Sequence, residues 1–397
     1  MITQLKYIKL CLLFLLLTAG CSEVPFDSRV IHIRLVITDN TPEFPLNNIP
    51  IVIKNQTIGN SYTQATDIDG KADIKISPGI CSVSFSHRLT KGMTTYNLSG
   101  GLASLTVEPG NQDLYLELPV SQTTAPQLVI EELYFSGCMR IDDKTHYTSD
   151  QYLAIANNSD QTVYLDGLCI AQAAPYTTAK PSSWMQLTDM KEIPLAMMCW
   201  QFPGNGTDNP LEPGQRQIIA TNAVDHTSGP AGVAASLDLS HVEWAFWNAA
   251  LTSSQITAGV RPLNLVWHGS AKVYALTVSG PTILLFLPQS DMTAWVADNS
   301  HIGTEPETTS KLQYLYIPAE WVIDVANFVT SAVQTANSRI PLTMDPSPGL
   351  AGPTGSGFAW RREHRKEGNR TVWETGRGTS RDFSRQQPSM KDNSGTN

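Results

Sequence analysis

Residues 61–86, SYTQATDIDGKADIKISPGICSVSFS, decide the fold of the first part of the chain. Apolar and polar residues alternate on both sides of Asp67–Gly70, and Pro78-Gly79 follows one strand length later. An alternation with a period of two predicts half-buried strands, and Asp, Gly and Pro at these positions predict tight turns between them. The stretch therefore predicts three short strands, at 63–66, 72–76 and 81–86.

Further segments of the same kind lie on both sides of this stretch. The first of them, IHIRLVI at 31–37, alternates and is rich in β-branched residues, and the others are 51–54, 102–107 and 114–120. Six or seven short strands at regular spacing are typical of a β-sandwich. We therefore expect a first β-sandwich domain over residues 29–121.

The turns of this domain carry a resemblance to a known family. They are the P-L-x-x-I turn at Pro45–Ile49, the T-D-x-x-G turn at Thr66–Gly70 and the P-G turn at Pro78–Ile80. The set resembles the transthyretin-like sandwich called the carboxypeptidase regulatory-like domain, although Ile80 and Cys81 replace its usual aromatic residue. The resemblance implies a spacer module rather than an enzyme.

A polar, proline-containing linker is predicted at 122–127, and a second β-rich domain is predicted over 128–397. Its strands are expected at 128–137, from Asp150 to Asn157, before Asp166-Gly167 and after Pro213-Gly214. The order of strands and turns resembles the lamin-tail, immunoglobulin-like sandwich. Leu168 replaces the tryptophan of that family and Ala154 stands where it often has glutamate, so the resemblance implies the fold and not a site. The expected fold class is all-β, with insertions in the second sandwich.

Five separated motifs follow one another in the second domain: Asn222–Thr227, Asp238–Ser240, Gly280-Pro281, Leu284–Phe286 and Ile317–Asp324. In this order they resemble a family of Bacteroidota outer-membrane lipoproteins with a domain of unknown function. The resemblance implies a regulatory-like sandwich in front of that domain and a place beside TonB-dependent outer-membrane transporters. Residues 374–383, ETGRGTSRDF, depart from the family pattern D-T-N-N-S-x-x-D-F.

The first 21 residues, MITQLKYIKLCLLFLLLTAGC, have the features of an export signal. A basic start precedes an apolar run at 10–17, which is too short to span a bilayer as a helix, and Thr18–Gly20 lead into Cys21. This pattern resembles a bacterial lipoprotein signal: residues 1–20 would be removed, Cys21 acylated, and residues 21–28 would form a tether. The alternative is an ordinary signal peptide with an incidental cysteine. Acyl chains such as palmitate on Cys21 would anchor the protein lastingly in outer-membrane lipid.

The charge balance argues against a nucleic-acid partner. The 397 residues carry a formal net charge of −9, whereas nucleic-acid binding depends on basic surfaces. Residues 361–397 are the exception, with nine Lys or Arg and five Asp or Glu. The run RREHRK at 361–366 is too densely charged for a core strand, so we expect a solvated strand or a disordered end. The functional alternative is a contact with anionic lipopolysaccharide or with an acidic transporter surface.

Four cysteines lie beyond Cys21. An oxidising compartment favours one disulfide among Cys138, Cys169 and Cys199, and buried free thiols are an equally good alternative. No CxxC pair occurs, so we expect no metal site and no cofactor. His226 has no paired histidine nearby and is expected to be a hydrogen-bonded loop residue.

Catalytic signatures are missing, and we expect no enzyme. The sequence has no G-x-S-x-G, H-E-x-x-H or G-x-x-x-x-G-K-[ST] motif, and the glycine-rich stretch 349–357 is expected to be a flexible loop. Glu131 and Glu132 are adjacent on a predicted strand. Because neighbours on a strand face opposite sides, these two carboxylates are not expected to share a site. Asp67 and Asp69 are expected to shape a turn rather than to bind a metal.

All nine tryptophans fall at or after Trp184. Aromatic faces stack on sugar rings and on planar ligands, so a binding platform is predicted at Trp244, Trp247 and Trp267. The alternative is that they fill the core of a large domain. Trp244 and Phe246 are expected on one face of a strand and Trp247 on the other, so only part of the group can serve either purpose.

These observations predict a lipid-anchored accessory binding protein of the outer membrane that works with a TonB-dependent transporter to capture a nutrient. The alternative is a structural or adhesive surface protein that binds a partner protein or a glycan. A concave aromatic pocket in the second domain would favour capture, flat aromatic patches would favour adhesion, and converging acids would favour an enzyme. The sequence does not identify the ligand.

Overall fold

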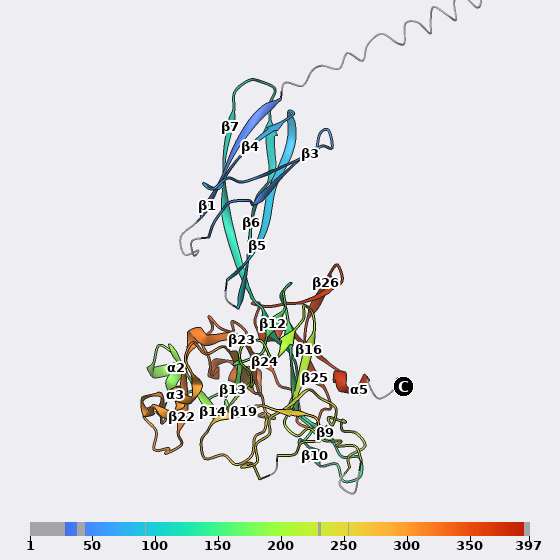
Figure 1. The fold of residues 1–397 in the computed structure, drawn as a ribbon, viewed down its shortest axis with the longest axis vertical. Coiled ribbons are helices and arrows are strands. Elements are labelled where there is room, and N and C mark those ends of the chain that lie inside the picture. The colour runs from blue at the N-terminus through green and yellow to red at the C-terminus, as the bar shows by residue number, and fades with distance from the viewer. Residues whose placement is uncertain (1–27, 38–43, 92, 229–231, 253, 393–397) are drawn as a thin grey trace, which may run out of the picture. The chain divides into compact units, whose positions relative to one another are not determined.

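The computed structural model describes residues 28–37, 44–91, 93–228, 232–252 and 254–392 (Figure 1). The predicted signal peptide and Cys21 lie outside the described residues. Within the described residues, no helix combines the length and the apolar character needed to cross a membrane. The chain is all-β, as predicted, and divides into two compact units. The first unit holds the described residues up to Leu89 and Tyr96–Thr123, and the second holds Thr90–Thr95 and the described residues from Thr124 onward.

Seven strands carry the first unit, and they include every strand predicted from the sequence. They are β1 (Arg29–Ile37), β2 (Pro50–Asn55), β3 (Ser61–Ala65), β4 (Lys71–Ile76), β5 (Gly79–Lys91), β6 (Thr94–Val107) and β7 (Leu114–Pro126). Their order is β3-β2-β5-β6-β7-β1-β4, and β1 runs parallel to β7. The boundary between the units, at Thr123 and Thr124, falls within the predicted linker at 122–127, but the segment up to Pro126 is the end of β7. β7 lies beside β6 in the sheet, so backbone pairing outweighs the polar composition there.

Alternation explains these strands. In β4 every second residue is buried, so that Ala72, Ile74 and Ile76 face the core and the charged residues between them face solvent. In the turn before β4, the Asp67 carboxylate accepts the backbone N–H groups of Asp69 and Lys71, each at 2.9 Å. Asp67 therefore shapes a turn, as expected.

The second unit contains two large sheets. The β8 sheet has the order β18-β17-β16-β11-β8-β25-β28. Its strands are β18 (Arg261–Pro262), β17 (Trp244–Ala245), β16 (Arg216–Ala220), β11 (Tyr152–Asn157), β8 (Leu128–Tyr134), β25 (Ala359–Arg362) and β28 (Phe383–Gln386). The β13 sheet has the order β21-β22-β14-β13-β20-β23-β24, with β19 also paired to β14. Its strands are β21 (Ile302–Gly303), β22 (Tyr314–Pro318), β14 (Glu192–Gln201), β13 (Cys169–Ala173), β20 (Thr282–Phe286), β23 (Val322–Val329), β24 (Gly349–Leu350) and β19 (Asn264–His268).

Short elements complete the second unit. Three strand pairs or hairpins are β9 (Cys138–Met139) with β10 (His146–Tyr147), β12 (Val163–Tyr164) with β15 (Pro210–Leu211), and β26 (His364–Glu367) with β27 (Arg370–Trp373). The helices are α2 (Ser183–Leu187), α3 (Met292–Ala297), α4 (Thr379–Asp382) and α5 (Ser389–Asp392), and the 3-10 helices are η1 (Asn299–His301), η2 (Ala319–Trp321) and η3 (Ala332–Asn337).

The main core of the second unit lies between the two sheets. It joins inward residues such as Ile130 and Ile155 of the β8 sheet to Ile170, Ile283 and Phe328 of the β13 sheet. The outer faces are buried as well, in separate apolar clusters. All residues of β8, β11, β13 and β20 are therefore buried, without the alternation of the first unit.

Candidate functional site

The three tryptophans predicted as a platform do not share one exposed face. Trp244 is 1% exposed and lies in the core between the sheets, and Trp267 is 8% exposed and lies in the cluster on the outer face of the β13 sheet. Both positions follow from strand geometry, because each side chain points to a buried face. Trp244 and Phe246 share the inner core and Trp247 packs on the opposite cluster, as the alternation predicted. Of the three, only Trp247 is half-buried at the surface.

Trp247 lines a pocket of about 510 Å³, here called the Trp247 pocket. Its lining residues are Gln201, Trp247, Asn248, Pro262, Leu263, Asn264, Leu265, Val266, Thr293 and Val296. None of these ten lining residues has an ionisable side chain. The volume lies in the range of small-molecule sites, and the lining combines three amides, a hydroxyl, an aromatic ring and aliphatic side chains.

Three parts of the second unit position this lining. Antiparallel pairing of β14 with β19 places Gln201 opposite Asn264, and the Gln201 amide donates to the carbonyl of Gly167 at 3.1 Å. Helix α3 brings Thr293 and Val296, and its N-terminus is capped by Asp291, whose carboxylate accepts the N–H of Ala294 at 2.8 Å. The segment after β17 brings Trp247 and Asn248.

A second pocket of about 400 Å³ adjoins the first and shares Pro262 and Asn264 with it. It is here called the Arg261 pocket, and its other lining residues are Pro203, Gly204, Asp208, Asn209, Trp244 and Arg261. The guanidinium of Arg261 lies 3.8 Å above the ring of Trp244. The two pockets together offer a neutral, amide-rich part and a part with one cation, Arg261, and one carboxylate, Asp208.

The chemistry of the Trp247 pocket suits a polyhydroxylated ligand. An amide group offers both donors and acceptors, which match hydroxyl groups that do both. An aromatic ring offers an apolar face to the C–H side of a sugar ring. Sequence reasoning identified Trp247 but missed Gln201, Asn264, Thr293 and Arg261. These residues come from separate elements, and no local motif links them.

Glu131 and Glu132 were wrongly expected to face opposite sides. Ala154 of β11 pairs with Glu132 and the next residue, Ile155, pairs with Ile130, so Glu131 is an extra residue in a β-bulge. The bulge turns both carboxylates toward Arg216, at 3.3 Å from Glu131 and 2.9 Å from Glu132. The carboxylates therefore converge, but on an arginine, and neither lines the Trp247 pocket.

Further contacts hold this acidic pair inside the protein. Glu132 is fully buried and accepts hydrogen bonds from Tyr152 Oη at 2.7 Å, and from the backbone N–H and the hydroxyl of Ser389 at 2.9 and 2.6 Å. Arg361 lies 3.8 Å from Glu131. Burial raises the pKa of Glu131 to about 7, although Arg216 opposes the shift. The C-terminal segment is thus attached to β8 through buried polar contacts.

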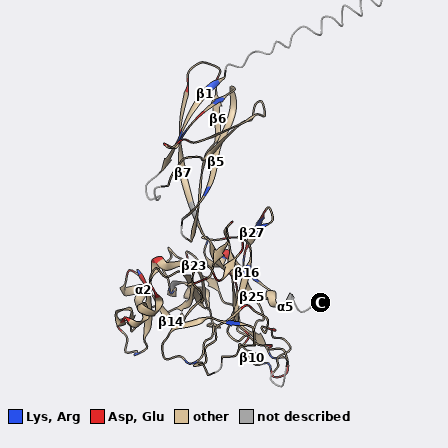
Figure 2. Cartoon of the chain, viewed as in Figure 1, with Lys and Arg blue, Asp and Glu red and all other residues tan. Residues whose placement is uncertain are grey.

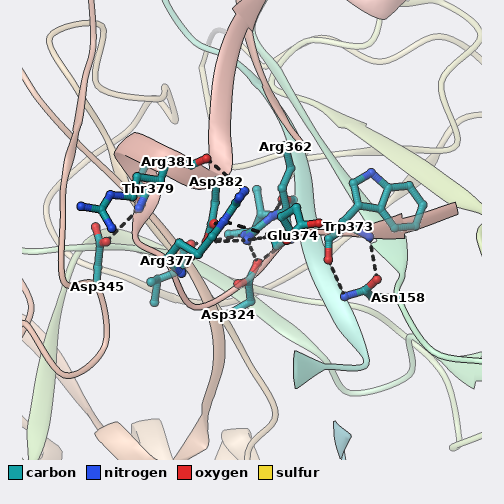
Figure 3. Close-up of polar contacts among 12 residues, drawn as sticks. Asn158, Asp324, Asp345, Arg362, Trp373, Glu374, Arg377, Thr379, Arg381 and Asp382 are labelled. Atoms are coloured by element: carbon teal, nitrogen blue, oxygen red, sulfur yellow. Dashed lines mark hydrogen bonds and ion pairs between the residues drawn. The ribbon is translucent and has the colours of Figure 1, made fainter. Parts of the chain in front are cut away.

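Figure 2 marks the Lys and Arg positions along the chain. In the basic segment at 361–366, which was expected to be a solvated strand or a disordered end, Arg362 is buried, whereas residues 364–366 are exposed. Arg362 is 2% exposed in β25 and forms a 2.6 Å ion pair with Asp324 of β23 (Figure 3). Its Nε donates to the carbonyl of Ile130 at 2.8 Å, its Nη1 donates to the carbonyl of Glu374 at 3.1 Å, and its guanidinium lies 4.5 Å from the ring centre of Phe383. Buried acceptors therefore compensate a charge that the sequence pattern placed in solvent. β26, which begins at His364, is exposed throughout, as expected of a solvated strand.

Residues 374–383 fold onto the same network (Figure 3). Arg377 pairs with Asp382 at 2.9 Å, and the backbone N–H of Thr379 donates to the carboxylate of Asp345 at 2.9 Å. Burial raises the pKa of Asp324 to about 6, with Arg362 opposing the shift. This segment connects strands of both sheets and does not line either pocket described above.

The cysteines and His226 are structural. Cys81, Cys138, Cys169 and Cys199 are buried free thiols, which is the second of the two alternatives. His226 is buried, with Nδ1 at 2.7 Å from Tyr147 Oη and Nε2 at 3.0 Å from the carbonyl of Asn222. Both ring nitrogens are therefore engaged, as expected of a hydrogen-bonded loop residue. Among the described residues, no group of three or more His, Cys, Asp or Glu side chains is placed to hold a metal ion.

The fold and the pockets define an all-β protein with a neutral, concave site in its second unit. Residues 212–390 match the family model described as "Protein of unknown function (DUF4876)". A crystal structure of a DUF4876 family protein from Bacteroides thetaiotaomicron VPI-5482 is similar over 93% of this chain and 98% of that chain, at 22% identity and a TM-score of 0.64. This likeness shows a shared fold, and it agrees with the predicted resemblance to a family of unknown function.

Two further solved structures are only remotely similar. A "putative adhesin" from Bacteroides ovatus ATCC 8483 shares 9% identity over 77% of this chain and 89% of its own, at a TM-score of 0.21. A "putative carbohydrate binding protein" from Bacteroides uniformis ATCC 8492 shares 8% identity over 75% of this chain and 98% of its own, at a TM-score of 0.16. These scores are too low to carry an argument about this chain. Comparison with curated proteins gives no match.

Proposed function

We propose that this protein is a cell-envelope binding protein that captures a carbohydrate in the Trp247 pocket. The observation that carries the proposal is the lining: amides from Gln201, Asn248 and Asn264, the hydroxyl of Thr293 and the ring of Trp247, without an ionisable group. Amide side chains pair with vicinal hydroxyls, and the aromatic ring covers the apolar face of a pyranose. The pocket is open to solvent, and its combination of an aromatic ring with four polar side chains supports capture of a glycan.

A binding assay tests the proposal directly. The full mature chain is screened against a panel of neutral oligosaccharides, and hits are measured by isothermal titration calorimetry. Trp247→Ala and Asn264→Ala should each weaken binding about tenfold or more, as truncation of a central contact residue does. Tyr115→Ala is the matched control, because Tyr115 is an 81% exposed aromatic residue of the first unit. Unchanged affinity in both pocket variants, or no binding to any panel member, would count against the proposal.

The cellular setting is part of the same proposal. The apolar run ending at Cys21 supports acylation of that cysteine and anchorage in outer-membrane lipid. Cys21→Ala should leave an unprocessed precursor that incorporates no palmitate. Equal palmitate labelling of the variant and the wild type would exclude acylation at Cys21.

The proposed partner is a TonB-dependent outer-membrane transporter. The sequence motifs that resemble transporter-associated lipoproteins support this partner. A lipid anchor confines the protein to two dimensions, which raises its effective concentration beside a transporter and allows a weak contact to suffice. Affinity purification of the lipidated protein from membranes solubilised in mild detergent should recover such a channel. Recovery of no transporter, or full function of a non-lipidated form, would overturn this part.

A further inference from the structure

The Arg261 pocket, unlike the Trp247 pocket, is lined by a cationic side chain, the guanidinium of Arg261. Arg261 is exposed, and its guanidinium stacks 3.8 Å above the ring of Trp244. Trp244 is itself fixed in the core and donates its indole N–H to Gln217. The cation is therefore held in one place by a rigid aromatic surface.

Most of the hydrogen-bonding capacity of Arg261 is unused. Its Nη1 donates to the amide oxygen of Asn209 at 2.8 Å, and within the described parts of the chain its guanidinium makes no ion pair. A guanidinium has five N–H donors. The opposite wall of the pocket thus orients this group without neutralising it.

The opposite wall is a rigid loop. The carboxylate of Asp166 accepts the backbone N–H groups of Gly206, Asp208 and Asn209 at 3.2, 2.9 and 2.9 Å. Although burial alone would raise it, these hydrogen bonds lower the pKa of the Asp166 carboxyl. Gly204 has φ +139°, and a Cβ there would lie 1.8 Å from Asp166 Oδ1, so the loop depends on glycine at this position.

The one acid in the lining is already engaged. The Asp208 carboxylate accepts the backbone N–H and the side-chain amide of Asn205 at 3.0 and 3.1 Å. Glu243, whose charge also acts on Arg261, does not line the pocket. Asp208 keeps its negative charge, and Arg261 is the cationic group among the described lining residues, so the free donors of Arg261 are what the pocket offers to an anion.

We propose that the Arg261 pocket is a second subsite that takes an oxyanion carried by the glycan bound in the Trp247 pocket. The shared lining of Pro262 and Asn264 joins the two pockets, so one extended ligand spans both. A guanidinium fork matches the two oxygens of a uronate carboxylate or of a sulfate ester. This inference rests on the proposed function and narrows its substrate class to acidic oligosaccharides.

Matched pairs of ligands test the subsite. Neutral oligosaccharides are compared by calorimetry with their uronic-acid and their sulfated counterparts, using the full mature chain. The wild type should prefer one acidic member about ten- to a hundredfold, the usual contribution of a hydrogen bond to a charged group. Comparison of the uronate and sulfate arms then decides which oxyanion is bound.

Two arginine variants provide the control. Arg261→Gln should abolish the preference for the acidic member and leave the affinity for the neutral member nearly unchanged. Arg140→Gln removes another arginine stacked on an aromatic ring, 4.9 Å from the ring centre of Tyr147. It should change neither the preference for the acidic member nor the affinity for the neutral member. Trp247→Ala should weaken both members equally.

The outcomes separate this inference from the proposed function. Equal affinity of the wild type for acidic and neutral members, or a preference for the acidic member that persists in Arg261→Gln, overturns the second subsite. In either case, binding of the neutral member that depends on Trp247 still supports carbohydrate capture. If no member of any pair binds the wild type, both fall.

Discussion

The two units bury their strands in different ways. In β4 of the first unit buried and exposed residues alternate, whereas β8 of the second unit is buried at every position. A strand with one solvated face shows alternation, and a strand covered on both faces does not. Whether a strand is covered on one face or on both, rather than its strand propensity, therefore decides whether its sequence shows the alternation that predicts a strand.

The units also differ in what they do with charge (Figure 2). The charges of β4 point to solvent, whereas the second unit buries Glu132, Asp324 and Arg362. A buried charge is tolerated only when it is paired and hydrogen-bonded, and removal of one partner leaves the other uncompensated. We therefore expect the stability of the second unit to depend on a few ionic contacts, and that of the first on apolar packing.

The largest effect is expected from removal of residues 359–397. The truncation deletes β25 and β28 from the β8 sheet, and it removes Arg362 as the partner of Asp324 and Ser389 as a partner of Glu132. Because this loss should exceed the roughly 5–15 kcal/mol that holds a domain together, the second unit should no longer unfold cooperatively. Tryptophan fluorescence in urea reports on this unit alone, since all nine tryptophans lie in it. A tryptophan transition like that of the wild type would contradict the ionic account.

A single substitution should give the next largest effect. Arg362→Met should destabilise the second unit by about 3–5 kcal/mol, because it removes the counter-charge of Asp324, whose buried carboxyl must then either stay charged without a partner or take up a proton. Arg365→Met is the matched control: Arg365 is exposed and pairs with Glu374 at 2.9 Å at the surface. Its loss should cost about 0–1 kcal/mol. Urea unfolding followed by tryptophan fluorescence measures both, and equal effects would remove the distinction between buried and surface charge.

The two adjacent glutamates allow a sharper test. The pKa of Glu131 is raised by burial from 4.5 to about 7, so its ionised form is disfavoured in the folded state. The stability linked to this group is fully present below pH 4.5 and is lost as the pH rises through 7. Glu131→Gln should therefore stabilise the second unit at pH 8, by at most about 3 kcal/mol, and the gain should shrink toward pH 5.

Glu132→Gln provides the opposite expectation at the neighbouring position. It weakens the contacts of Glu132 with Arg216, Tyr152 and Ser389, so it should destabilise the second unit at both pH values. Chemical unfolding at pH 5 and pH 8 measures the pair of variants. If both variants change the free energy of unfolding in the same direction at pH 8, Glu131 and Glu132 do not have different roles in stability.

The sequence predicted the first unit well because its determinants are local. Alternation and the Asp67–Gly70 turn located its strands, but β5, β6 and β7 are longer than predicted, since β5 ends at Lys91, β6 begins at Thr94 and β7 ends at Pro126. In the second unit the four predicted strands correspond to β8, β11, β12 and β16, whereas most of the remaining strands were not predicted. The bulge at Glu131 and the burial of Arg362 were missed because both depend on partners more than 20 residues away. The Trp247 pocket was identified through one residue, since its other walls come from β14, β19 and α3.

The smallest effect is expected in the first unit, at His32 on its solvated face. His32 Nδ1 lies 2.7 Å from Asp73 and Nε2 lies 3.4 Å from Asp113, and the hydrogen bonds to these carboxylates raise its pKa above 6.5. The linked stability is present below pH 6.5 and is lost as the pH rises through the raised value. It has the same sign as that of Glu131, but it arises from attraction to carboxylates rather than from burial of a carboxyl. Asp73→Asn should therefore lower the His32 pKa measured by NMR titration. It should also make the unfolding of the first unit less dependent on pH, as followed by far-UV circular dichroism, because this unit has no tryptophan to report its unfolding by fluorescence. Asp69→Asn changes a charge in the neighbouring turn and should leave the His32 pKa unchanged. If Asp73→Asn also leaves the His32 pKa unchanged, the stability of this unit does not depend on pH through the pair of His32 and Asp73.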